Sequence, residues 1–71
     1  MDKLRLYISQ DDKKYPIARY DQETESITKS DCLFAMRIAF VCDFEHKEFD
    51  LFLLRDGDII GHKQLTKDVK G

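Results

Sequence analysis

The sequence has few residues that interrupt secondary structure or form disulfides, with one proline, three glycines and two cysteines among 71 residues. It has no tryptophan. So little proline and glycine, together with 11% aromatic residues, excludes a disordered or low-complexity chain. Two cysteines do not form the disulfide framework of small secreted domains. The longest apolar stretch, 32–42, is interrupted by Arg37 and is far shorter than the ~20 residues that span a bilayer. Because the first residues also lack the apolar segment of a secretory signal, we expect a reduced, cytoplasmic protein without membrane contact.

Charge of either sign is not in large excess, since 12 basic and 14 acidic side chains give a formal net charge of −2. Strong binding to nucleic acid needs a basic surface, so we expect no direct contact with nucleic acid. The segment 31–58 is more acidic, with seven carboxylates against three basic side chains. This pattern is typical of a solvated surface, and it also suits a protein that presents carboxylates to a basic partner.

The length of the chain allows one domain at most. A domain of this size buries only about 60% of the surface that its unfolded chain exposes. We expect 1–71 to form a single small domain, with a core over about 3–65 and a tail over 66–71.

Two hairpins are predicted, one on each side of the central apolar segment. Apolar and polar residues alternate over 4–9 and 15–20, which indicates two strands joined by a polar turn of about five residues. Pro16 cannot donate a hydrogen bond to a neighbouring strand, so the strand over 15–20 should lie at an edge of the sheet.

The second hairpin contains the strongest short turn signal of the sequence, Asp56-Gly57. A buried strand over 49–54 precedes this turn, and a returning strand over 59–65 follows it. Gly61 lies inside the returning strand and indicates a bulge or a close approach of another segment.

The segment 32–42 decides the fold, and two interpretations compete. As a helix, it has an N-cap in Thr28 or Ser30 and a favourable carboxylate in its first turn, Asp31. As a strand, alternate residues from Phe34 onward form an unbroken apolar face. Length, capping and composition favour the helix.

A helix over 30–43 packed on two hairpins gives an α+β fold with the order ββαββ. The alternative is an all-β, five-stranded small barrel. The stretch from Leu33-Phe34 through Phe49-Asp50-Leu51-Phe52-Leu53, followed by a turn and Lys63-Gln64-Leu65, resembles the ubiquitin-like lobe of FERM domains and Ras-association domains. This resemblance to the ubiquitin-like β-grasp superfamily implies a β-grasp-like sheet with one packed helix. It also implies a non-catalytic recognition module that works through a sheet face or an edge strand.

The residues able to bind a soft metal or act as nucleophiles are few: Cys32, Cys42, His46 and His62. They lack the compact Cys-x₂₋₄-Cys spacing of zinc sites, so we expect folding without metal. Cys42 and His46 lie four residues apart and could be combined with Asp43 into a nucleophilic site. Both cysteines lie in the most apolar stretch, however, where thiols are usually inert. We therefore expect no cofactor and no enzymatic activity, and a small Cys/His metal protein or enzyme is the third interpretation.

Protein binding is the function that the sequence favours, as an adaptor, an inhibitor or an accessory subunit. Arg37 falls within the apolar stripe of a helical wheel, so it either is buried with a carboxylate or marks an exposed apolar patch. The predicted edge strand offers unpaired backbone groups for strand addition. The candidate interaction residues are Tyr15, Ile17, Arg19, Tyr20 and Arg37.

The partner of such a module is another protein or a second copy of the chain. The large apolar residues are more than one face of so short a domain easily hides, which favours self-association or an obligate partner. The alternative function is an acidic blocker of a nucleic-acid-binding protein, whose binding would depend strongly on salt.

Overall fold

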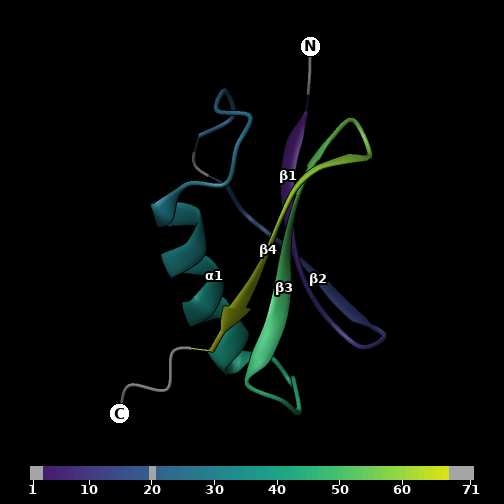
Figure 1. Cartoon of the computed structure of the whole chain (residues 1–71), viewed down its shortest axis with the longest axis vertical. Coiled ribbons are helices and arrows are strands. Elements are labelled where there is room, and N and C mark those ends of the chain that lie inside the picture. The colour runs from purple at the N-terminus through teal and green to yellow at the C-terminus, as the bar shows by residue number, and fades with distance from the viewer. Residues whose placement is uncertain (1–2, 20, 68–71) are drawn as a thin grey trace.

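The computed structural model describes residues 3–19 and 21–67 and shows one sheet with a single helix beside it (Figure 1). The strands lie in the order β2-β1-β3-β4, and every neighbouring pair is antiparallel. The predicted α+β class and the order ββαββ are confirmed, and the architecture is compatible with a β-grasp-like fold. The all-β barrel is wrong because the deciding segment is helical. The elements are β1 (Leu4–Gln10), β2 (Lys13–Ile17), α1 (Lys29–Val41), β3 (Glu48–Arg55) and β4 (Asp58–Thr66).

The first hairpin is tighter than the sequence predicts. Gln10 pairs with Lys13, which leaves a two-residue loop, and Asp11 in this loop has a φ of 56°. Aspartate tolerates this left-handed conformation, which suits short hairpin loops. β2 therefore begins earlier than predicted and ends at Ile17. The predicted end of this strand, Tyr20, lies outside the described residues.

The second hairpin has the predicted turn. Asp56 and Gly57 have φ values of 51° and 91°, the pair of positive values that a type I′ turn requires. The register of β3 and β4 shifts between Leu53 and Leu54, so Gly61 lies beside a bulge. A Cβ atom on Gly61 would lie 3.4 Å from Cγ1 of Ile27, which packs over this part of β4. Both readings of Gly61, a bulge and a close approach, are thus confirmed.

The helix begins with a capping box. The hydroxyl of Thr28 accepts a hydrogen bond from the backbone N–H of Asp31 at 3.1 Å. The carboxylate of Asp31 accepts one from the backbone N–H of Thr28 at 2.9 Å. Thr28 is therefore the N-cap, and the other candidate, Ser30, lies within the first turn. The helix ends at Val41, slightly before the predicted boundary, and Cys42 is its C-cap.

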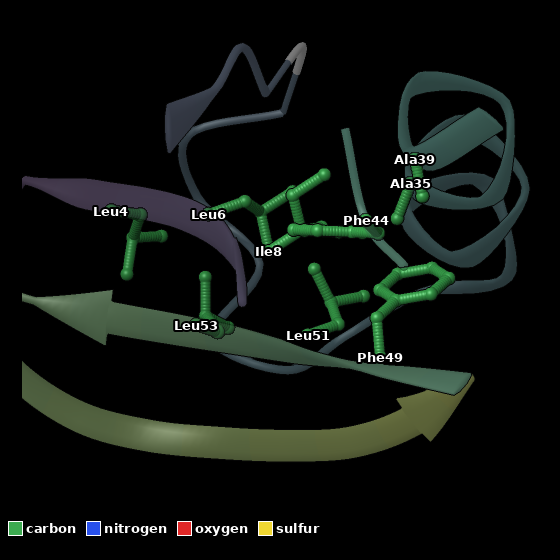
Figure 2. Close-up of a cluster of buried hydrophobic side chains, with 9 residues drawn as sticks. All are labelled: Leu4, Leu6, Ile8, Ala35, Ala39, Phe44, Phe49, Leu51 and Leu53. Atoms are coloured by element: carbon green, nitrogen blue, oxygen red, sulfur yellow. The ribbon is translucent and has the colours of Figure 1, made fainter. Parts of the chain in front are cut away.

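The core lies between one face of the sheet and α1 (Figure 2). Alternate residues of β1 and β3 point into it, while α1 contributes two alanines and the following loop contributes one phenylalanine. Because alanine is short, the helix can pack close to the sheet. Among the described residues, no helix is long and apolar enough to cross a membrane. The buried apolar residues are Leu4, Leu6, Ile8, Ala35, Ala39, Phe44, Phe49, Leu51 and Leu53.

The described C-terminal end is tied to the loop between α1 and β3. β4 continues through Thr66, the first residue of the predicted tail. The backbone N–H of Lys67 donates to the carbonyl of Lys47 at 2.8 Å, and its ammonium group donates to the carbonyl of Phe44 at 2.8 Å. Residues 66 and 67 thus belong to the folded unit.

Candidate functional site

The outer face of α1 carries large apolar side chains that the rest of the fold leaves exposed. We define this outer face as Leu33, Phe34, Arg37, Phe40 and Val41. Its four apolar members are 56%, 42%, 56% and 79% exposed, in that order, whereas Ala35 and Ala39 on the opposite side of the helix are 0% exposed. The helix thus turns two alanines toward the core and leaves four large apolar side chains exposed, while Met36 and Ile38 are half-buried against the core.

The helical period explains this arrangement. Residues three and four positions apart share a face of a helix, so Asp31, Ala35 and Ala39 form one side. This side meets the sheet, where the long side chains of β1 and β3 already fill the core. The positions of the outer face fall on the opposite side. Folding therefore removes only part of their apolar surface from water, and the rest remains available for a partner.

Arg37 lies at the centre of the outer face and is exposed. In the part of the chain that the structure describes, its guanidinium has no hydrogen-bond or ion-pair partner. Of the two environments considered for Arg37, burial with a carboxylate or exposure within an apolar patch, the structure has the second. The outer face therefore combines apolar surface with one unpaired positive charge.

Of the candidates predicted for the edge strand, Tyr15 and Ile17 lie in β2, and their side chains point toward the core side of the sheet. The ring of Tyr15 packs at 5.7 Å from that of Phe44, and its hydroxyl donates a hydrogen bond to the carboxylate of Asp43. This hydrogen bond raises the pKa of Tyr15 and lowers that of Asp43. Ile17 is half-buried against the core. Tyr15 and Ile17 thus contribute to the fold, and Tyr20 lies outside the described residues.

Arg19 is buried, with 7% of its surface exposed, although the sequence suggested it as a surface contact. One nitrogen of its guanidinium lies 3.0 Å from the Asp31 carboxylate. The same group donates to the carbonyl of Ser26 at 2.6 Å and to that of Thr24. Arg19 therefore holds the 21–28 segment against the start of α1 and is not presented to a partner. The alternation of Tyr15 and Ile17 puts position 19 on the inward side, which was the available signal.

Asp31 is the partner of Arg19, whereas the sequence predicted for it only a role in the first turn of the helix. Burial by itself would raise its pKa, but hydrogen bonds from Arg19 and from the backbone N–H of Thr28 outweigh this effect. The pKa of Asp31 consequently lies below its usual value, and the carboxylate is ionised at neutral pH.

The two outer strands of the sheet differ in how well they are protected. β2 lies at one edge, as Pro16 predicts, and it is short and carries Lys13 and Lys14. Proline and lysine are typical of edges that avoid further pairing. β4 lies at the other edge, is nine residues long and contains no proline.

A groove of about 340 Å³ runs between α1 and β4. Its walls are mostly apolar, and two lysines, one from the helix and one from the strand, lie along it. No carboxylate is among the described residues that line it. The lining residues are Ile27, Thr28, Lys29, Cys32, Leu33, Met36 and Lys63.

The face of the sheet away from α1, the open face, carries a row of rings across three strands. Tyr7 on β1 pairs in register with Phe52 on β3, which pairs with His62 on β4. The His62 ring stacks on Phe52 at 4.8 Å and its Nε2 lies 2.9 Å from Asp50, while the ammonium of Lys14 lies 5.1 Å from the centre of Tyr7. Such cross-strand pairs stabilise a small sheet.

The candidate soft ligands are dispersed over the fold. Cys32 and Cys42 are free thiols near opposite ends of α1. His62 lies on the open face, and His46 lies in the loop before β3, 4.0 Å from Asp11. Within residues 3–19 and 21–67, no three His, Cys, Asp or Glu side chains are grouped to hold a metal ion. Burial and the neighbouring Asp43 raise the pKa of Cys42, which keeps this thiol protonated.

Several carboxylates of the acidic segment have partners within the chain. Asp43 lies 3.4 Å from the ammonium of Lys13, and Asp50 pairs with His62. Asp56 accepts a hydrogen bond from the backbone N–H of Lys3 at 3.0 Å. In each of these contacts, a single carboxylate joins two neighbouring elements of the fold.

No protein-family model, curated protein or solved structure matches this chain.

Proposed function

We propose that this chain is a non-catalytic interaction module that binds another protein through the outer face of α1. The observation that carries the proposal is the exposure of four large apolar side chains around the unpaired Arg37. Contiguous apolar surface on a small domain is typical of a protein-binding site. Recognition through a β-grasp-like scaffold, which the resemblance implies, is consistent with this role. The two free thiols suit a reducing, cytoplasmic environment.

The composition of the outer face supports binding to protein. Aromatic residues and arginine contribute most of the binding energy at protein interfaces, and Phe34, Phe40 and Arg37 are of these types. Burying an apolar side chain yields about 1.5–3 kcal/mol when exposed and buried states are compared. Because the helix backbone is already ordered by its core side, a partner gains this energy without folding the helix.

The charge of the outer face favours a different protein over a second copy. Leu33 and Phe34 precede Arg37 by the same spacing with which Phe40 and Val41 follow it. Two antiparallel copies of α1 would match these apolar pairs but would place two Arg37 guanidinium groups together. Like charges facing each other across an interface cost several kcal/mol. A partner with an apolar surface and one carboxylate opposite Arg37 satisfies both features.

The proposal is tested first by the mass of the protein in solution. Sedimentation velocity between about 1 and 100 μM, the range that brackets micromolar affinity, should show a monomer. A dimer that Phe34→Ser abolishes would replace the separate partner with a second copy and overturn this part of the proposal.

The partner itself is sought by affinity capture from the native host with matched variants. We expect the wild type to retain a partner in stoichiometric amount, and we expect Phe34→Ser/Phe40→Ser and Arg37→Glu to lose it. Ile59→Ser is the control, because Ile59 is a large exposed residue on the open face of the sheet. A partner retained equally by all variants, or no partner retained by the wild type, would contradict the proposal.

A further inference from the structure

The free edge of β4 is open to strand addition, which the other edge of the sheet resists. On its outer side β4 pairs with no strand among the described residues. Beyond the bulge, residues 61–66 keep a regular register with β3, so their backbone is in extended geometry. An edge of this kind presents unpaired N–H and C=O groups to an incoming strand.

The groove between α1 and β4 lies beside this edge and provides a place for side chains. Lys63 pairs in register with Leu51, whose side chain is buried, so both residues face the helix side of the sheet. Met36 and Cys32 of α1 form the facing apolar wall. Alternate side chains of a strand point to the same side, so every second residue of an added strand would enter this groove.

We infer that an extended segment of another protein adds to β4 along residues 61–66 as a fifth strand. On the side of this strand that faces α1, apolar side chains enter the groove between α1 and β4, and carboxylates at other positions of the same side meet Lys29 and Lys63. Main-chain hydrogen bonds supply part of the affinity, and the groove and the two lysines select an acidic, apolar sequence.

The charges of the site identify this occupant. Lys29 and Lys63 lie along the groove, whose described lining contains no carboxylate. Glu25, which lines the adjoining hollow beside Lys63, pairs with Arg55 at 2.7 Å. A second copy of β4 would bring its own Lys63 to the edge, and a copy of β2 would bring Lys13 and Lys14. Both copies would therefore add positive charge to a positive site, whereas an acidic segment complements it.

This site is separate from the binding mode proposed for the outer face of α1. Lys63 and Met36 do not belong to the outer face, and the two surfaces share Leu33. Variants at Phe34 and Phe40 therefore affect one site, and variants at Lys29 and Lys63 affect the other. The failure of either proposal leaves the other intact.

The experiment uses a fluorescein-labelled peptide of eight residues in which every second position, the set that faces the groove, is by turns leucine and glutamate, and the other positions are threonine. Its matched controls are a peptide with lysine in place of each acid and two N-methylated peptides. Alternate amides of an extended peptide point to opposite edges. One of these peptides is methylated on the amides of its first edge, and the other on the amides of its second edge, so only one of them has lost the amides that pair with β4. Fluorescence anisotropy with the full chain gives the dissociation constants, and amide hydrogen exchange locates the contact.

We expect the acidic peptide to bind saturably below about 1 mM and the lysine peptide to bind at least about tenfold more weakly. N-methylation of the peptide edge that pairs with β4 should weaken binding by about tenfold or more, while methylation of the opposite edge should have a smaller effect. Amides within 61–66 should become protected from exchange when the peptide binds. Equal binding of the two N-methylated peptides, or protection located outside β4, would overturn the inference.

The chain is tested with a charge-reversed pair and a matched control. Lys29→Glu/Lys63→Glu should weaken binding of the acidic peptide by about tenfold or more. Lys3→Glu/Lys14→Glu makes the same change in charge away from the groove and from residues 61–66, and should alter binding less than about twofold. Phe34→Ser/Phe40→Ser should also leave the peptide affinity unchanged. No saturable binding by the wild type, or equal losses in the two charge-reversed variants, would refute strand addition at this groove.

Discussion

The two faces of α1 differ in a way that separates folding from binding in a single helix. The inner face consists of a buried carboxylate and two buried alanines, and the outer face consists of four large apolar residues around an arginine. The inner face is small because β1 and β3 already fill the core with long side chains. The size of the side chains alone therefore does not tell which side of this helix faces the core. Substitutions on the inner face should unfold the protein, and substitutions on the outer face should change what it binds.

The largest expected effect is at the start of the inner face. Arg19→Met leaves the Asp31 carboxylate buried without its partner, which should cost about 3–5 kcal/mol of unfolding free energy. Urea denaturation followed by circular dichroism measures the loss. The double variant Arg19→Met/Asp31→Asn removes the charge and keeps an oxygen for the cap, so it should recover part of the stability. A cost below about 1 kcal/mol, typical of exposed pairs, would show that the pair contributes as little as a surface ion pair.

A smaller loss is expected where the inner face meets the sheet. Ala39→Leu adds volume to a position that is 0% exposed, and such overpacking should cost about 1–3 kcal/mol. Phe40→Leu, at the next position on the outer face, is the matched control and should change the unfolding free energy by less than about 0.5 kcal/mol. Thermal and urea denaturation of both variants make the comparison. Equal losses would mean that the two faces do not differ in their contribution to folding.

Low pH should weaken the inner face through Asp31. Its pKa is lower in the folded state than the unfolded value of about 3.9, so its ionised form contributes stability above that pH. This contribution should be lost as pH falls below about 3.9 and through the folded pKa. Unfolding free energies measured from neutral pH into this range should fall more steeply for the wild type than for Asp31→Asn. Asp21 and Asp43 also have lowered pKa values, but they are present in both proteins and cancel in the difference. Parallel pH profiles would contradict the role of Asp31.

The smallest effect on stability is expected at the outer face itself. Phe34→Ser and Phe40→Ser should each lower the unfolding free energy by no more than about 1 kcal/mol, because these side chains are already 42% and 56% exposed in the folded protein. Binding of a dye that reports exposed apolar surface should decrease in both variants. A loss of several kcal/mol would place these residues in the core and remove the distinction between the two faces.

The sequence by itself determined the local elements. The alternation in 4–9 predicted β1, and Asp56-Gly57 predicted the turn between β3 and β4. Gly61 predicted a bulge or a close approach of another segment, and the structure has both. These features depend on backbone conformation and on neighbours in the chain, so they can be read from a single sequence. The sequence also offered Thr28 and Ser30 as N-caps of a helix over 30–43, and the helix spans Lys29–Val41 with Thr28 as its N-cap.

Only the tertiary structure decided which side of each element faces the core. The segment 32–42 is apolar on both sides, so periodicity could not separate helix from strand or choose the buried face. The sequence suggests a surface position for Arg19 because its partner, Asp31, lies twelve residues away in the sequence and meets it only after folding. Gln10 is buried for the same reason, since its amide donates to the carbonyl of His46 in the loop before β3 and to that of Glu48 at the start of β3. Long-range pairing sets these environments, because a polar or apolar side chain is stable inside only when segments distant in the chain provide its partners.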